Sequence, residues 1–217
     1  MTEEETYRLR RNFDLVGAVT AGAAVLGQLV LMLTNLQTDL LESLVRFVSY
    51  FTILTNTLVA VYYGMHYRYG ERAWITRPGA VTAVTAFILI VGIVYQVVLR
   101  WTWSPTGWNW VVDELLHSVV PTYALIYYVL FSDRADHGFR RVAPWLAYPF
   151  VYFALVLLRG AGSGFYPYPF VDVTMLGYSQ VWQNAFYITG FALLLIGVLI
   201  VIGKWRTRPP ATTEPEA

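Results

Sequence analysis

Six apolar stretches, each close to twenty residues long, constrain the fold of this 217-residue chain more than any other feature. A helix needs about 20 apolar residues to cross the hydrocarbon core of a bilayer. We therefore predict an all-α integral membrane protein, built as a bundle of six transmembrane helices. The helices are expected at residues 15–36, 47–67, 80–99, 111–131, 142–158 and 181–203.

The composition supports a membrane protein and excludes several other classes. Only 13% of the residues are charged, about half the usual share in a soluble domain. The net charge of +1 gives no reason to expect a nucleic-acid partner. Because there is no cysteine, disulfides, zinc thiolate sites and a cysteine nucleophile are excluded. We expect one domain at 1–206, no cofactor and a disordered tail at 207–217, where the sequence is acidic and contains Thr and Pro.

The basic residues predict the orientation of the bundle. Twelve of them lie on the side of the two termini, and only Arg46, Arg100 and Arg159 lie on the other side. Cytoplasmic loops of membrane proteins carry the excess of Lys and Arg. Both termini are therefore predicted to be cytoplasmic. Arginine outnumbers lysine, which hints at a GC-rich bacterial genome, so we expect a multi-pass protein of a bacterial inner or plasma membrane.

His117 is the residue most indicative of function, because the surrounding segment 111–131 is otherwise apolar enough to cross a membrane. An ionisable side chain at membrane depth is costly unless it faces a protein interior or a wet cavity. Asp113 and Glu114 precede His117 by four and three residues, so either carboxylate can reach the imidazole ring. A carboxylate on one ring nitrogen leaves the other nitrogen free to act as a base.

Thr52 lies at a similar depth on the preceding inward-running span, about 9 Å below Arg46 at 1.5 Å per residue. Its spacing from Ser49 and Asn56 predicts one polar stripe on a single helix. A hydrolytic site would use Thr52 as the nucleophile, His117 as the general base and Asp113, preferred over Glu114 for its shorter side chain, to orient the ring.

Other polar side chains in the outer third of the bundle are candidates for binding a substrate. The candidate oxyanion donors are Asn56, Gln96 and Asn184, and the candidate clamp for an anionic group consists of Arg46, Arg100 and Arg159. A structural interpretation stands beside each assignment. Membrane threonines commonly bond their own helix or a neighbouring one, His117 could bond another span, and arginines extend toward headgroups or pair with carboxylates. His66 and His137 fall in polar connections on the other face, so no three-histidine metal site is expected.

Three segments together resemble one known family. They are SYFTILTN (49–56), LLHSVVP (115–121) and YPYPFVD (166–172). In order and topology they are similar to the androgen-induced-gene family of multi-pass membrane hydrolases, whose animal members cleave fatty acid esters of hydroxy fatty acids. The resemblance covers roughly residues 10–205 and implies that Thr52 and His117 form a catalytic pair.

Two departures accompany this resemblance. Animal members have one more residue between the histidine and the proline than separates His117 from Pro121, and Thr55 is a rival nucleophile within the same motif.

Two functions are therefore open. The first is a membrane-embedded lipid ester hydrolase whose substrate enters sideways from the bilayer. The alternative is a non-catalytic small transporter or lipid-binding protein. A transporter is expected to have paired broken helices near the midplane. Pro121, Pro144 and Pro149 can kink the later spans, whereas no matching interruption is predicted in the first half.

Overall fold

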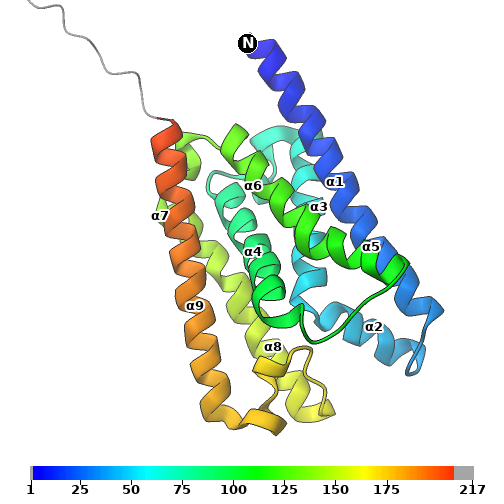
Figure 1. Ribbon diagram of the computed structural model, residues 1–217. Coiled ribbons are helices and arrows are strands. Elements are labelled where there is room, and N and C mark those ends of the chain that lie inside the picture. Colours follow the sequence, from blue (N-terminus) through cyan, green and yellow to red (C-terminus); the bar gives the residue numbers. More distant parts are fainter. Residues whose placement is uncertain (1, 208–217) are drawn as a thin grey trace, which may run out of the picture.

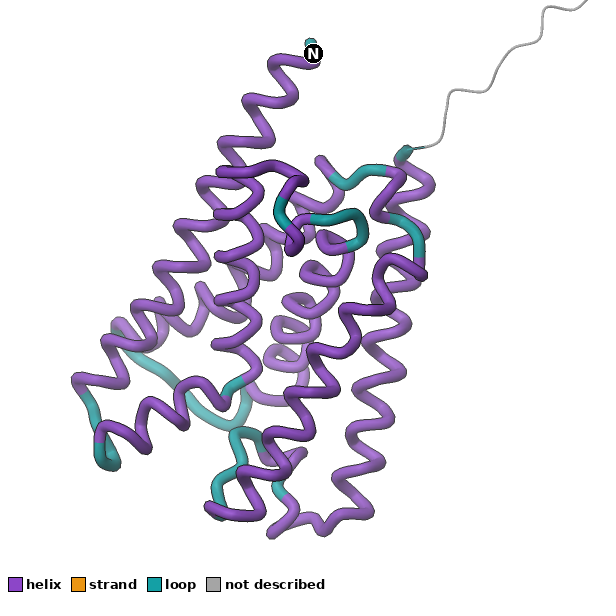
Figure 2. The backbone as a smooth tube through the Cα atoms, turned by 180° about the vertical axis from the view of Figure 1, so that it is seen from behind, coloured by secondary structure: helices purple, strands orange, loops and turns teal. Residues whose placement is uncertain are grey.

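The computed structural model describes residues 2–207, and this part of the chain is helical with no β-strand (Figures 1 and 2). The α-helices are α1 (Glu3–Thr34), α2 (Leu40–Ser49), α3 (Phe51–Tyr69), α4 (Ala80–Val94), α5 (Trp108–Glu114), α6 (Val120–Phe131), α7 (Phe139–Val142), α8 (Ala147–Ser163) and α9 (Val173–Arg206). The predicted all-α fold class is confirmed. The predicted disordered tail lies, apart from Thr207, outside the described residues.

Five helical segments are long and apolar enough to cross a membrane, and a bent pair, α2 with α3, could make a sixth. The predicted stretch 80–99 matches the segment Ala80–Leu99, and three others lie within wider segments, Trp108–Phe131, Phe139–Ser163 and Val173–Arg206. The first stretch, 15–36, overlaps Glu3–Thr34, which begins earlier and ends two residues sooner. The start of α1 and the end of α9 lie at the same end of the bundle, and α2 lies toward the opposite end (Figure 1).

The second predicted span, 47–67, is wrong as a continuous helix. The chain bends by 72° between α2 and α3, and Tyr50 at the break has extended dihedral angles of φ −81° and ψ 125°. Ser49 therefore belongs to α2, where its hydroxyl donates to the Val45 carbonyl at 2.6 Å. The predicted stripe of Ser49, Thr52 and Asn56 along one helix does not exist.

The amphipathic sequence of α2 explains why it leaves the direction of α3. Leu40, Leu41 and Leu44 are exposed, whereas Glu42 pairs with arginines. Asp39 caps the helix by accepting a hydrogen bond from the Glu42 amide at 3.0 Å. A short helix with one apolar face and one charged face suits the plane of a membrane interface.

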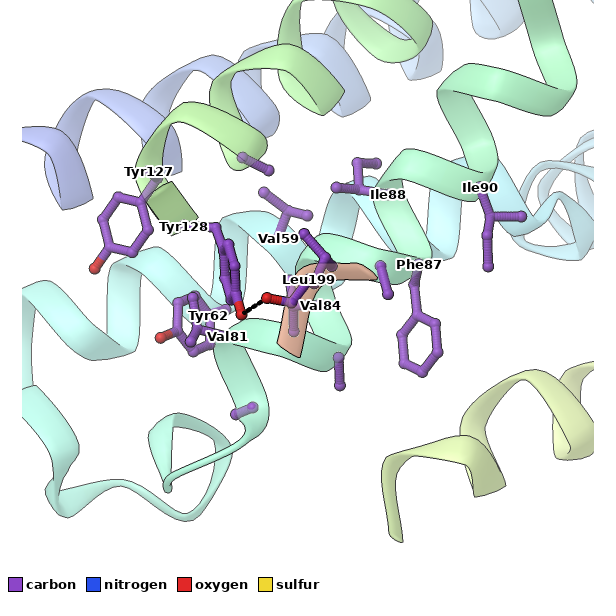
Figure 3. Packing of buried hydrophobic residues seen from close by; sticks show 14 of the residues in the cluster. Val59, Tyr62, Val81, Val84, Phe87, Ile88, Ile90, Tyr127, Tyr128 and Leu199 are labelled. Atoms are coloured by element: carbon purple, nitrogen blue, oxygen red, sulfur yellow. Dashed lines mark hydrogen bonds between the residues drawn. The ribbon is translucent and has the colours of Figure 1, made fainter. Parts of the chain in front are cut away.

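Helix α4 forms the centre of the bundle, and its residues 80–88 are all buried. The core packs side chains of α3, α4, α6 and α9 together, including Tyr62, Phe87, Tyr128 and Leu199 (Figure 3). The Tyr128 hydroxyl donates to the Leu199 carbonyl at 2.7 Å. This satisfies a polar group that would otherwise be costly inside the core. Helices α3 and α6 both pack against α4 and also meet each other, where the rings of Tyr63 and Tyr127 lie 4.7 Å apart.

Candidate active site

Thr52 lies in the first turn of α3, immediately after the break at Tyr50, and its side chain is buried. Its Oγ1 is 3.4 Å from Nε2 of His117. The first N–H groups of a helix have no intrahelical acceptor, and the Thr52 amide donates instead to the Tyr168 hydroxyl at 3.1 Å. The predicted proximity of Thr52 and His117 is confirmed, and their catalytic role stays a prediction.

A proline positions His117 on the facing helix. Pro121 has no N–H to donate to the carbonyl of His117, four residues earlier. In this region the chain forms a π-helical turn, Leu115–Val119, in which the Val120 amide bonds to the Leu115 carbonyl. Such turns locally widen a helix and often occur at functional sites. The Tyr95 ring, from a second π-helical turn, stacks on the His117 ring with a centroid distance of 4.0 Å.

Asp113 orients the imidazole of His117. Nδ1 of His117 is 2.9 Å from the Asp113 carbonyl oxygen and 3.2 Å from the Asp113 carboxylate Oδ1. Both atoms accept hydrogen bonds, so the proton resides on Nδ1, and Nε2 is left to accept a proton from Thr52. The other carboxylate oxygen accepts a hydrogen bond from the Tyr95 hydroxyl. Asp113 is therefore buried with both oxygens in use.

Glu114 faces a different set of partners. Its carboxylate accepts hydrogen bonds from Arg100 at 2.7 Å and from the Ser118 hydroxyl at 2.5 Å. These contacts leave Asp113 as the carboxylate beside His117, as the sequence predicted.

Tyr168 completes the surroundings of Thr52, and the sequence reasoning did not select it. Its hydroxyl oxygen lies 3.2 Å from Thr52 Oγ1, although the residue belongs to the connection between α8 and α9. The ring stacks on Phe170 at 5.2 Å and meets Tyr50 edge-on. Burial raises the pKa of Tyr168 to about 12, so its hydroxyl stays protonated at neutral pH. The motif YPYPF was the available signal, but such aromatic runs are also expected at a membrane interface.

An apolar cavity of about 370 Å³ opens beside Thr52. Its walls come from α4, α8, α9 and the connection that carries Tyr168, and no charged side chain lines it. The residues in its lining that carry a hydroxyl or an indole N–H are Thr52, Tyr152, Tyr168, Trp182 and Thr189. Thr52 thus contacts His117 on one side and the cavity on the other.

Thr55, the rival nucleophile, points elsewhere. Its Oγ1 lies 2.9 Å from the Tyr148 hydroxyl, and the residue is fully buried. Asn56 is also fully buried, and its Nδ2 donates to the carbonyls of Thr52 at 2.9 Å and Leu116 at 3.3 Å. Asn56 therefore links the turn that carries Thr52 to the π-helical turn that carries His117.

The other two predicted oxyanion donors lie outside the cavity wall. Nε2 of Gln96 donates to the Ser118 hydroxyl at 2.8 Å, and its carbonyl oxygen accepts from Arg100. Nδ2 of Asn184 donates to the Phe170 carbonyl at 2.8 Å. Gln96 therefore lies beside Glu114, with which it shares Ser118 and Arg100 as partners. Asn184 lies against the loop that carries Tyr168.

The three arginines that the sequence predicts on the outer side are paired with carboxylates. Arg46 and Arg159 both bind Glu42, at 2.7 and 2.9 Å, and their guanidinium groups lie over the Phe165 ring. Arg100 binds Glu114 at 2.7 Å. None of the three lines the cavity beside Thr52. The structure thus shows these three residues in ion pairs rather than in the cavity wall.

Two buried histidines were missed, because the sequence placed His66 and His137 in polar connections. His66 is in α3, buried, with Nδ1 2.7 Å from the Asp14 carboxylate of α1. The Tyr127 hydroxyl donates to the other Asp14 oxygen at 2.7 Å. This network joins α1, α3 and α6 through polar contacts. Within residues 2–207, no three His, Asp or Glu side chains are close enough to hold a metal ion.

The chain matches no protein-family model, no curated protein and no solved structure. The resemblance to the androgen-induced-gene family therefore rests on the three motifs alone.

Proposed function

We propose that this chain is a membrane-embedded lipid ester hydrolase that uses Thr52 as its nucleophile and His117 as its general base. The observation that supports this most is the chain of contacts from Asp113 through His117 to Thr52, which ends at an apolar cavity. A base hydrogen-bonded to a hydroxyl and oriented by a third group is the arrangement that activates a weak nucleophile.

The reaction proceeds in two steps. His117 Nε2 takes the Thr52 proton while Oγ1 attacks the ester carbonyl, and the leaving alcohol then receives that proton. This gives an acyl-Thr52 ester. Water then attacks the acyl group, with His117 as the base, and releases the acid. Asp113 stabilises the imidazolium that forms in each step.

The cavity suits the hydrocarbon chain of a lipid. Burial of a methylene group from water contributes roughly 0.8 kcal/mol, so a chain presented from water gains affinity for this cavity with length, whereas a chain already in the bilayer does not. Fatty acid esters of hydroxy fatty acids, the substrates implied by the family resemblance, are the first esters to assay. Recognition of their free carboxylate by Arg46, Arg100 or Arg159 would require an ion pair with Glu42 or Glu114 to open.

We further propose six crossings of a bacterial inner or plasma membrane, with both termini cytoplasmic and the site in the outer half. The arginine distribution and the common position of the start of α1 and the end of α9 support this orientation (Figure 1). The Thr212→Cys variant should resist an impermeant thiol reagent in intact cells and react after the cells are opened. Reaction in intact cells would reverse the orientation.

The decisive experiment labels the purified protein with a long-chain fluorophosphonate and maps the modified residue by mass spectrometry. Thr52→Ala and His117→Ala should abolish labelling and hydrolysis of a long-chain ester, whereas Thr52→Ser should retain part of both because it keeps the hydroxyl. Thr55→Ala is the matched control, because Thr55 lies one helical turn away and contacts Tyr148 instead of His117. Label found on Thr55 would exclude Thr52 as the nucleophile.

A non-catalytic transporter or lipid-binding protein is the second candidate, and one observation favours it. The break at Tyr50 interrupts a helix in the first half, where the sequence predicted no interruption. Transporters use such broken helices at their substrate sites. If the wild type takes no label and turns over no ester, yet binds a radiolabelled long-chain ester, this second candidate replaces the hydrolase.

A further inference from the structure

We infer that the Tyr168 hydroxyl is the oxyanion donor of the proposed hydrolase. This inference rests on the proposed function and assigns to Tyr168 a role that the sequence gave to three amide side chains. Attack of Thr52 on an ester places negative charge on the carbonyl oxygen. A donor fixed near that oxygen is commonly the largest single contribution to acyl transfer.

The three amides are poorly placed for that role. Asn56, Gln96 and Asn184 donate to carbonyl or hydroxyl oxygens of other residues, and none of them lines the cavity. Tyr168 lines the cavity, and its hydroxyl oxygen is 3.2 Å from the attacking atom, Thr52 Oγ1. Because the new bond joins Oγ1 to the carbonyl carbon, the oxyanion forms within reach of this hydroxyl.

The hydrogen bonds around Tyr168 leave its proton available. The Thr52 amide donates to the phenol oxygen at 3.1 Å, which occupies one lone pair and leaves the O–H to point toward Oγ1 or toward a substrate. With the imidazole proton on Nδ1, the Thr52 hydroxyl can donate to His117 Nε2, 3.4 Å away. The Thr52 amide and the Thr52 hydroxyl thus each have an acceptor before the reaction. The Tyr168 hydroxyl is the donor that can turn from Thr52 Oγ1 to the substrate oxygen.

The ring of Tyr168 is held firmly enough to aim that hydroxyl. It is buried, stacks on Phe170 and contacts Tyr50 edge-on. A preorganised donor is more effective than a mobile one, because no reorganisation is needed as charge develops.

In the attack step the Oγ1–carbon bond forms, the carbonyl π pair moves to the carbonyl oxygen, and the Thr52 proton moves to His117 Nε2. The oxyanion accepts a hydrogen bond from Tyr168, whose O–H bond stays intact. When the intermediate collapses, the π bond re-forms, the alkoxide leaves, and the imidazolium supplies its proton.

Tyr168→Phe tests the inference, because phenylalanine keeps the ring contacts and removes only the hydroxyl. The matched control is Tyr128→Phe, which also removes a hydrogen-bonded hydroxyl from a buried ring, but in the core (Figure 3). We expect Tyr168→Phe to lower kcat about 10²- to 10³-fold on a long-chain ester. The Tyr128→Phe variant should stay close to the wild-type rate.

Two inhibitors separate an oxyanion donor from a structural tyrosine. A long-chain trifluoromethyl ketone forms a tetrahedral anion with the nucleophile, whereas the corresponding ether only fills the cavity. Tyr168→Phe should weaken binding of the ketone by about the factor lost in kcat/KM and leave binding of the ether unchanged. Equal weakening of both ligands, or a variant with more than a third of wild-type kcat, would overturn the assignment.

The activities of the wild type, Thr52→Ala and Tyr168→Phe, together with the affinities for the two inhibitors, separate a wrong role for Tyr168 from a wrong function for the protein. An active wild type, an inactive Thr52→Ala variant and an active Tyr168→Phe variant would reject Tyr168 and leave the hydrolase intact. A wild type that neither hydrolyses the ester nor binds the ketone more tightly than the ether would reject both.

Discussion

Gly92 of α4 allows the close approach of α6 that positions His117. A Cβ atom at position 92 would lie 2.9 Å from Cβ of Pro121 and 3.1 Å from the carbonyl oxygen of His117. Both contacts are shorter than ordinary van der Waals distances. Gly92→Ala should therefore push the π-helical turn of His117 away from α4, and with it the imidazole away from Thr52.

The control is Gly190→Ala in α9, because a Cβ atom there meets nothing within 4 Å. Each substitution gains up to about 1 kcal/mol of helix propensity, so this gain cancels between the two variants. Overpacking costs about 1–3 kcal/mol, and Gly92→Ala should be less stable than Gly190→Ala by that amount. A shift of His117 by about 1 Å should also reduce esterase activity by roughly 10²-fold.

Stability is measured by reversible unfolding in mixed micelles, and activity by ester turnover and fluorophosphonate labelling. Equal stability of the two alanine variants, with full labelling of Gly92→Ala, would refute the argument that this close approach determines the position of His117. Loss of activity without loss of stability would show that the site tolerates less movement than the fold does.

Three further predictions concern carboxylates. Asp113→Asn should lower ester turnover by at least 10-fold, since general base catalysis contributes a factor of about 10²–10⁴ to the rate. Glu114→Gln should lower turnover less. The reverse ranking in steady-state assays would remove Asp113 from the mechanism. Asp14→Leu should destabilise the protein by at least 1–3 kcal/mol, because His66 and Tyr127 lose a buried acceptor; an unfolding midpoint equal to that of the wild type would contradict this. Asp172 caps α9, and hydrogen bonds from Thr174 and Met175 hold its pKa below the usual 3.8. The stability contributed by the ionised Asp172 cap is therefore fully present above pH 3.8 and is lost as the pH falls through the lowered pKa. Asp172→Asn should flatten the dependence of the melting temperature on pH below 4.

The positions of most helices could be predicted from the apolar runs alone, because runs of that length have few alternatives in a bilayer. The break at Tyr50 could not be predicted in this way. Neither Gly nor Pro marks it, and the bend follows from the amphipathic sequence of α2 together with contacts made by distant residues. One of these is the Tyr152 hydroxyl, which donates to the Ser49 carbonyl at 3.0 Å.

Thr52, His117 and Asp113 could be selected from residue type, spacing and depth. Tyr168 was missed because its contact with Thr52 joins residues 116 positions apart, and no periodicity connects a loop to a helix. For the arginines the sequence left two roles open, binding an anionic group and pairing with carboxylates. The pair of Arg46 with Glu42 follows from helical spacing, since the two residues are four apart, whereas the contact of Arg159 with the same carboxylate joins distant parts of the chain and could not be predicted.

The candidate site consists of residues at the places where regular helices are interrupted, and this follows from the chemistry of an apolar bundle. A continuous helix uses its own carbonyls and amides, so it leaves no backbone group to orient a side chain. The break before Thr52 frees the amide that bonds Tyr168, and the proline after His117 accompanies the widened turn in which Nδ1 lies against Asp113. In a chain with so few polar side chains, such interruptions supply the hydrogen-bonding groups that position the proposed nucleophile, base and oxyanion donor, which come from three distant segments.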